Sequence, residues 1–176
     1  MARSCRDPAR ASCAPAGASV FLGGQFFDSY FKFALVRNPF DRFISYCAFM
    51  LRGGDVFRNR PQDVMRHFLF RDSPEQHILF QSQASLLVDE DGKTLLANGI
   101  GRVEDMQHSY DAICRQIGIR PRLLERMNGS THADYRHYYN RELIDAVAAR
   151  YAQDLELFGY SFDDASNASL AAEARG

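Results

Sequence analysis

Lysine is almost absent from this chain of 176 residues. Of its 21 basic residues only Lys32 and Lys93 are lysines, and all the others are arginines. Arginine presents a planar fork of donors that can bind an anion in a bidentate way, whereas lysine acts as a compact point charge. A site that needs a lysine therefore has few positions available, and residues 1–30 contain none.

A strong net charge, paired cysteines and long apolar runs are also missing. The formal net charge is -1, so the overall field does not favour nucleic acid or an anionic membrane surface as a partner. The four cysteines show no C-x-x-C and no Cys/His ligand spacing, so neither a disulfide framework nor a structural zinc is indicated. No segment approaches the ~18 apolar residues of a membrane span, and no secretory signal opens the chain. Reduced thiols in a cytoplasmic protein fit this pattern best.

Length and composition predict one globular domain. Hydrophobic residues make up 46% and charged residues 24% of the chain, which is ordinary for a protein with a single core. Residues 1–20 are rich in Ala, Arg, Ser and Pro without apolar periodicity, so we expect a disordered leader, with an Arg-rich organelle-targeting peptide as the alternative. Residues 21–162 form the expected domain, and residues 163–176 form a loose tail.

The pattern that bears most on function is a strand that runs directly into a helix. Residues 31–36 form a short apolar run with a charge only at Lys32, and Arg-Asn-Pro ends it abruptly, as expected for a buried strand. Asn38 then offers an N-cap side chain, and Pro39 has the fixed φ that suits the first helical position. Apolar residues recur along one helical face until Gly53-Gly54 ends the helix.

Apolar periodicity predicts further helices, which cover residues 61–70, 106–117 and 141–158. Asn140 caps the last of them, and Gly118 and Gly159 are well placed to end the second and the third. Strand signals cover residues 86–88, 94–96 and 100–103. The first two of these flank Asp91-Gly92, so we expect a hairpin there.

Arg37 and Ser45 are the candidate anion-binding residues. The first N–H groups of a helix lack partners and the helix dipole favours negative charge, so a strand-to-helix junction is a ready anion site. Arg37 lies at the strand exit, where it can form a bidentate contact with a phosphate. Ser45 lies two turns into the helix, on the side opposite Phe40 and Ile44. The alternative is a surface arginine paired with Asp41 and a solvated serine, and local physics does not choose between the two.

The string from Arg37 to Tyr46 reads Arg-Asn-Pro-Phe-Asp-Arg-Phe-Ile-Ser-Tyr. It resembles the motif with which sulfotransferases bind the 3′-phosphate of their sulfate donor, in particular the second family, which contains carbohydrate sulfotransferases. The resemblance covers residues 26–162. Other segments match that family in the expected order: His77–Gln83, Ile100–Glu104, Asn128–Ser130, His132–Tyr139 and Glu156–Tyr160.

The resemblance implies transfer of a sulfuryl group from 3′-phosphoadenosine 5′-phosphosulfate to a hydroxyl group of a carbohydrate acceptor, without a metal. It assigns the 3′-phosphate to Arg37 and Ser45, and it places Asn128 and Ser130 in a polar loop that can line the nucleotide site. Glu104 is expected to stabilise a strand-to-helix junction rather than to contact the ligand. The implied fold is a helix-rich α/β fold of the P-loop nucleoside-phosphate-binding type, with a small parallel sheet.

One part of the family pattern is not visible. By the resemblance, a Gly/Thr/Ser loop with a lysine holds the sulfate end of the donor ahead of Arg37, yet residues 1–30 contain no lysine. We therefore expect the first βα unit to be truncated or diverged, which leaves either an enzyme read from an incomplete sequence or a non-catalytic nucleotide-binding member. A kinase-like phosphotransferase is disfavoured because no Gly-x-x-x-x-Gly-Lys-Ser/Thr loop is present. The catalytic residues are unknown, with Glu75 and His77 as open options for a general base.

Overall fold

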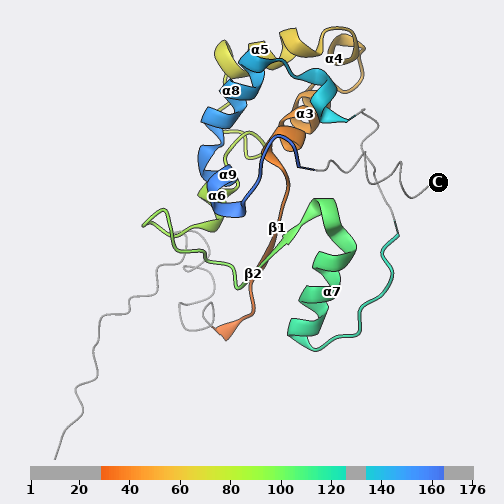
Figure 1. The fold of residues 1–176 in the computed structure, drawn as a ribbon, viewed down its shortest axis with the longest axis vertical. Helices are drawn as coiled ribbons and strands as arrows, with labels where there is room; N and C mark the ends of the chain where they lie inside the picture. The colour runs from red at the N-terminus through yellow and green to blue at the C-terminus, as the bar shows by residue number, and fades with distance from the viewer. Residues whose placement is uncertain (1–28, 126–133, 165–176) are drawn as a thin grey trace, which may run out of the picture.

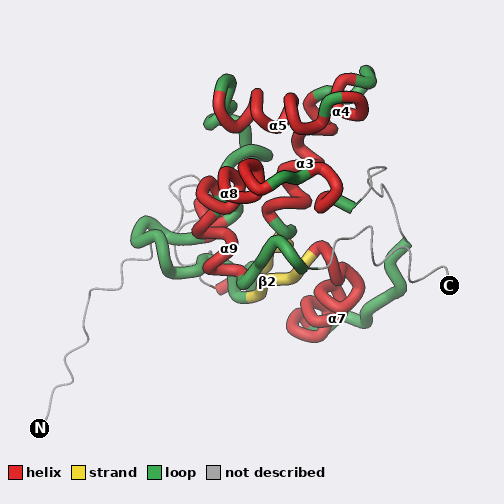
Figure 2. The backbone as a smooth tube through the Cα atoms, turned by 45° about the horizontal axis from the view of Figure 1, so that its top comes forward, coloured by secondary structure: helices red, strands yellow, loops and turns green. Residues whose placement is uncertain are grey.

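The computed structural model describes residues 29–125 and 134–164. In this part of the chain, strands β1 (Phe33–Val36) and β2 (Gly99–Arg102) form a parallel two-stranded sheet. The expected strand 31–36 is confirmed in its last four residues, and β2 begins one residue earlier than expected. The expected burial of the strand holds only for Val36, because Phe33 and Leu35 are exposed. The predicted helix-rich α/β fold with a small parallel sheet is therefore confirmed (Figure 2).

Helices cover both faces of the sheet (Figure 1). They are α3 (Pro39–Met50), α4 (Val56–Asn59), α5 (Pro61–Phe70), α6 (Ala84–Leu87), α7 (Met106–Ile117), α8 (Arg141–Arg150) and α9 (Ala152–Phe158), with 3-10 turns η1 (Val103–Asp105) and η2 (Tyr135–Tyr138). Helix α7 packs against β2 on one face, while α6 and α9 lie on the other, where Val36 is buried. Within the described ranges, no helix is both long enough and apolar enough to cross a membrane.

A glycine lets α7 approach the sheet closely. A Cβ atom at Gly101 would lie 2.7 Å from side-chain carbons of both Leu35 and Ser109, closer than real side chains come. Ser109 of α7 uses this proximity, because its Oγ accepts a hydrogen bond from Arg102 N (2.8 Å) and donates one to Arg102 O (3.0 Å). The last main-chain groups of β2 are thus satisfied by a side chain rather than by another strand.

The helix boundaries follow the capping residues that the sequence predicts. Asn38 Oδ1 accepts from Phe40 N at 3.0 Å, and Asn140 Oδ1 accepts from Leu143 N at 3.0 Å. Helix α5 has the predicted bounds. Gly118 (φ 75°) and Gly159 (φ 62°) end α7 and α9 in the left-handed conformation that favours glycine.

Two predicted elements differ in the structure. The hairpin is reduced to one antiparallel bridge between Val88 and Leu95, because Leu87 and the residues before it form α6. The turn itself is present, with Asp91 accepting bonds from the main chain of Lys93 and Thr94 at 2.8 Å. The last long helix is divided into α8 and α9 at Tyr151 (φ −107°, ψ 28°).

The division at Tyr151 is a local bend in an almost continuous helix. Tyr151 N still bonds to Val147 O, and Leu155 N still bonds to Tyr151 O, both at 3.0 Å. The apolar spacing therefore runs on through the bend, and sequence periodicity carries no signal for it.

Aromatic residues make up much of the core, and the hydroxyls of four of its tyrosines bond to main-chain carbonyls. The largest cluster joins α3, α5 and α8 around Phe40 and Phe43, both almost fully buried. In these four tyrosines the hydroxyl satisfies itself and a carbonyl in surroundings with little water. The donor–acceptor pairs are Tyr135 to Phe162, Tyr139 to Phe40, Tyr151 to Phe80 and Tyr160 to Val36. The buried hydroxyl of Tyr46, in contrast, has no hydrogen-bond partner among the described residues.

We expect Asn38→Ala to destabilise the protein more than Asn140→Ala. Both changes remove an N-cap, which is worth about 1 kcal/mol. Asn38 is fully buried and its Nδ2 also donates to Ser161 O at 2.8 Å, so its loss should cost about 2–3 kcal/mol. Urea unfolding of both variants measures the difference. Equal losses would show that the buried bond to Ser161 contributes nothing.

The free energy of unfolding should fall as pH rises from 10 to about 12. Burial raises the pKa of Tyr135 and Tyr151 from 10.0 to about 12. Over this window the unfolded state binds fewer protons than the folded state, so raising the pH favours unfolding. Urea unfolding below and within the window tests this, and Tyr151→Phe should reduce the slope. A free energy that does not change with pH would contradict the expectation.

Candidate functional site

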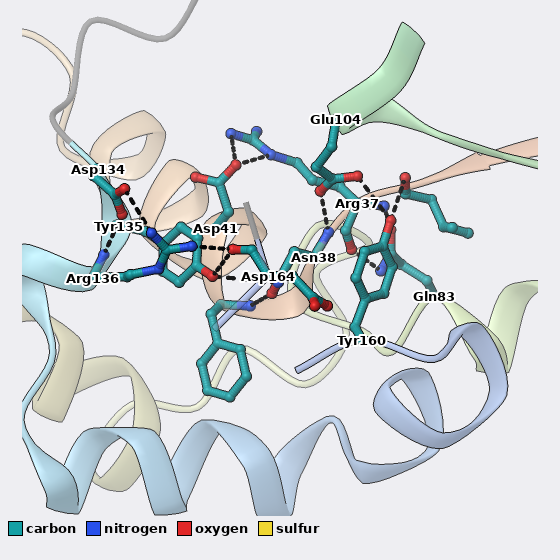
Figure 3. A network of polar contacts seen from close by, with 12 residues as sticks. Arg37, Asn38, Asp41, Gln83, Glu104, Asp134, Tyr135, Arg136, Tyr160 and Asp164 are labelled. Atoms are coloured by element: carbon teal, nitrogen blue, oxygen red, sulfur yellow. Dashed lines mark hydrogen bonds and ion pairs between the residues drawn. The ribbon is translucent and has the colours of Figure 1, made fainter. Parts of the chain in front are cut away.

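The junction between β1 and α3 has its main-chain donors already satisfied (Figure 3). Arg37 N donates to Gln83 Oε1 (2.9 Å), and Asn38 N donates to Glu104 Oε1 (2.6 Å). Phe40 N donates to the side chain of Asn38 itself. Pro39 has no N–H to offer. The expectation of free amides at the helix start is therefore not met for Arg37, Asn38 and Phe40, so side chains are the main groups with which this junction can hold an anion.

The Arg37 guanidinium is paired with Asp41 (Figure 3). Its Nε and Nη2 lie 2.8 and 2.7 Å from Asp41 Oδ2. The Asp41 side chain is 2% exposed and that of Arg37 is 20% exposed, so the carboxylate lies inside and the arginine reaches the surface. Arg37 Nη1 makes no hydrogen bond to the described residues. Asp41 thus fixes the plane of the fork and leaves donors for a ligand.

Ser45 is half-buried and lies one helical turn after Asp41. Residues four apart share a face of an α-helix, so Ser45 and Asp41 lie on the same side of α3. Because Arg37 is held against Asp41, the structure brings the two predicted phosphate ligands to one side of this helix. The other two predicted ligands, Asn128 and Ser130, lie outside the described residues.

The second arginine of the motif, Arg42, has a structural role. Its Nη1 donates to Gln81 O at 2.7 Å and its Nη2 to Ile78 O at 3.1 Å. Burial lowers its pKa, because desolvation disfavours the charged form. Arg42 therefore ties α3 to the segment before α6, whereas Arg37 pairs with Asp41 of α3 itself and reaches the surface.

Glu104 links the two strand ends. Its Oε1 accepts from Asn38 N, and its Oε2 accepts from the hydroxyl of Tyr160 at 2.9 Å. The same hydroxyl lies 3.2 Å from Val36 O, and burial is the main reason why the pKa of Tyr160 is raised. The predicted junction role of Glu104 agrees with these contacts, although the junction it stabilises is mainly that of β1 and α3.

The C-terminal segment is tied to the same junction through η2. Tyr135 is fully buried, and its hydroxyl lies 2.9 Å from Asp164 O. Arg136 pairs with Asp134 at 3.2 Å and donates to the main-chain oxygen of Asp164. Asn38 Nδ2 reaches Ser161 O. The tyrosine-rich part of the family-like sequence thus holds the chain in place around Asn38 (Figure 3).

Asp154 is a site residue that the sequence analysis did not select. It is fully buried in α9 and accepts from Ser82 Oγ (2.5 Å), Gln83 N (2.9 Å) and Ala84 N (2.7 Å). It therefore caps α6 from a distant helix. A signal was present, because Asp154 falls on the apolar stripe beside Tyr151, where a carboxylate needs buried partners.

The two open options for a general base have other partners. Glu75 pairs with Arg150 at 2.6 Å, and the hydrogen bond from Arg150 lowers the pKa of Glu75. His77 Nδ1 accepts from Leu79 N at 3.3 Å, and its ring packs edge-on against Tyr46. Neither arrangement identifies a base. Among the described residues, no group of three or more His, Cys, Asp or Glu side chains is placed to hold a metal ion.

The described strand-to-helix junctions carry no lysine. The segment between β1 and α3 holds Arg37 and Asn38, and β2 passes through η1 into α7. Neither resembles a lysine-bearing loop for the sulfate end of a donor. Among the described residues, Arg37 and Ser45 lie on one side of α3, and the two junctions offer no lysine for a sulfate.

Comparison with known proteins gives one match. Residues 21–50 match the sulfotransferase family. No curated protein and no solved structure matches the chain. The matched stretch contains β1, the junction and α3. The match confirms the sulfotransferase resemblance of this chain, and it rests on the strand-to-helix segment that holds Arg37 and Ser45.

Proposed function

We propose that this protein transfers a sulfuryl group from 3′-phosphoadenosine 5′-phosphosulfate to a hydroxyl group of a carbohydrate. The observation that carries the proposal is the Arg37 fork, which Asp41 orients at the strand-to-helix junction inside the family-matched segment. The family match supports sulfuryl transfer in general. The identity of the donor, the carbohydrate acceptor and a cytoplasmic location belong to the proposal.

In this proposal the 3′-phosphate of the donor is bound by side chains. Arg37 contributes charge and bidentate geometry, and the hydroxyl of Ser45 contributes one further donor. Asn128 and Ser130 are proposed to line the same nucleotide site. We also propose that the fold is of the P-loop type, because a small parallel sheet with helices on both faces is compatible with such a fold.

Sulfuryl transfer requires in-line displacement at sulfur, with the acceptor oxygen attacking as the bond to the phosphate oxygen breaks. A protein accelerates such a step mainly by orienting the reactants and stabilising charge on the leaving oxygen. Arg37 and Ser45 serve the first task, because they fix the nucleotide end of the donor. The proposed mechanism uses no metal, and it leaves the proton acceptor unassigned.

A second candidate function is nucleotide binding without transfer. It is favoured by one observation, that the described strand-to-helix junctions hold no lysine that could neutralise the leaving phosphate. Both functions share the 3′-phosphate site at Arg37. They differ in whether the sulfuryl group moves.

Arg37→Ala should weaken binding of adenosine 3′,5′-bisphosphate by about 1.5–3 kcal/mol, the usual range for hydrogen bonds to charged groups. Ser45→Ala should weaken it by about 1 kcal/mol. Isothermal titration calorimetry on the purified chain measures both. Arg58→Ala is the matched control, because the Arg58 side chain is 83% exposed and its ion pair within the described part of the chain is with an exposed Asp55. Equal affinity of Arg37→Ala and the wild type would move the phosphate site elsewhere.

The purified chain should produce sulfated oligosaccharide when it is incubated with 3′-phosphoadenosine 5′-phosphosulfate and a mixture of carbohydrate acceptors. Mass spectrometry detects the added sulfuryl group, and Arg37→Ala should abolish most of the product at low donor concentration. Binding of the bisphosphate without any transfer would favour the non-catalytic alternative. Absence of binding at millimolar nucleotide by the folded protein would reject both functions.

A further inference from the structure

The main chain of Arg37 is held at the edge of the sheet by one side chain. Arg37 N donates to Gln83 Oε1 at 2.9 Å, and Gln83 Nε2 donates to Arg37 O at 2.8 Å. One amide group thus satisfies both main-chain groups of Arg37, as a neighbouring strand would do. With both groups fixed, Arg37 leaves β1 in a defined direction.

Gln83 is itself held by Asp154. The Asp154 carboxylate accepts from Gln83 N at 2.9 Å and from Gln83 Nε2 at 3.4 Å. The Gln83 residue is 8% exposed and Asp154 is 0% exposed. Because water has little access to this pair, the acceptor Asp154 decides which way the Gln83 amide is turned. The hydrogen bonds thus run without a gap from α9, through the start of α6, to the end of β1.

We propose that Gln83, oriented by Asp154, is a positioning residue for Arg37 in 3′-phosphate binding. Asp41 fixes the guanidinium at its outer end. Gln83 fixes the main chain from which that side chain extends. A fork that binds phosphate in a bidentate way depends on both being in place, since a shift of ~1 Å spoils the geometry. The inference rests on the proposed function, because it assumes that Arg37 contacts the phosphate.

The second strand of the sheet provides a matched comparison. Ser109 satisfies Arg102 N and O at the end of β2, as Gln83 satisfies Arg37 N and O at the end of β1. The Arg102 side chain, however, turns to Phe158 O at 2.7 Å and stacks on the ring of Tyr160. The two clamps are alike in kind, and only the clamp at Gln83 holds a proposed phosphate ligand.

The test uses Gln83→Met, which keeps the length of the side chain but loses the amide, and Ser109→Ala as the matched control. Calorimetry compares adenosine 3′,5′-bisphosphate with adenosine 5′-monophosphate, which lacks the 3′-phosphate. We expect Gln83→Met to lower the affinity for the bisphosphate about tenfold, because the Arg37 side chain is still present but is displaced from its binding position. The affinity for the monophosphate should stay unchanged. Ser109→Ala should leave both affinities unchanged.

A double variant separates positioning from general stability. In the Arg37→Ala background, Gln83→Met should cause no further loss of bisphosphate affinity, because residues that act through one contact are not additive. Asp154→Asn should resemble Gln83→Met in the same comparison. If Gln83→Met does not fold, Gln83→Asn retains the amide on a shorter side chain, and its loss should again be confined to the bisphosphate.

Several results would overturn the inference. One such result is a Gln83→Met variant that folds and binds the bisphosphate as tightly as the wild type. Equal losses for both nucleotides, or an equal loss for Ser109→Ala, would show that the clamp only stabilises the fold. Failure of the wild type to bind the bisphosphate would instead reject the proposed function, and the positioning role with it.

Discussion

The structure depends on how the main-chain groups at the end of β1 are satisfied. A strand that runs directly into a proline-started helix leaves several buried donors and acceptors within a few residues. Gln83, Glu104 and Asn38 provide the partners. Each of these side chains has a second bond that fixes it, so the junction is the point where β2, α6, α9 and the C-terminal segment meet (Figure 3).

This constraint decides how the site can recognise an anion. Helix starts commonly bind phosphate through free amides, but here the amides of Arg37, Asn38 and Phe40 already have partners within the protein. In the proposed site, recognition passes to the side chains, with Arg37 held by Asp41 on one side of α3 and Ser45 one turn further along. A carboxylate next to the arginine lowers the local positive charge. It also keeps the fork in one plane, which favours a planar, bidentate contact over a diffuse attraction.

The same need for internal partners explains the aromatic core. The core buries many large aromatic rings, and the rings of its tyrosines each carry a hydroxyl. Tyr139 and Tyr160 direct theirs to the carbonyls of Phe40 and Val36, on either side of the junction. The core therefore supports the site with hydrogen bonds as well as with packing. Such bonds strengthen where water is excluded.

Features that arise within a few residues could be predicted from the amino-acid sequence alone. The strand before Arg37 and the caps at Asn38 and Asn140 follow from local rules of capping and periodicity. Arg37 and Ser45 are candidate ligands because their motif resembles that of the sulfotransferases. The match to the sulfotransferase family covers residues 21–50, the stretch that contains Arg37 and Ser45.

The distant side chains that complete the junction became known from the packing of the folded chain. Gln83 meets Arg37 across 46 residues, Glu104 meets Asn38 across 66, and Asp154 meets Gln83 across 71. A contact between distant residues also accounts for the shortened hairpin. Asp154 caps α6, and Leu87 belongs to that helix rather than to the predicted strand. Capping and periodicity act along the chain, whereas a buried polar group takes whichever partner the packing brings to it, and that choice is made in three dimensions.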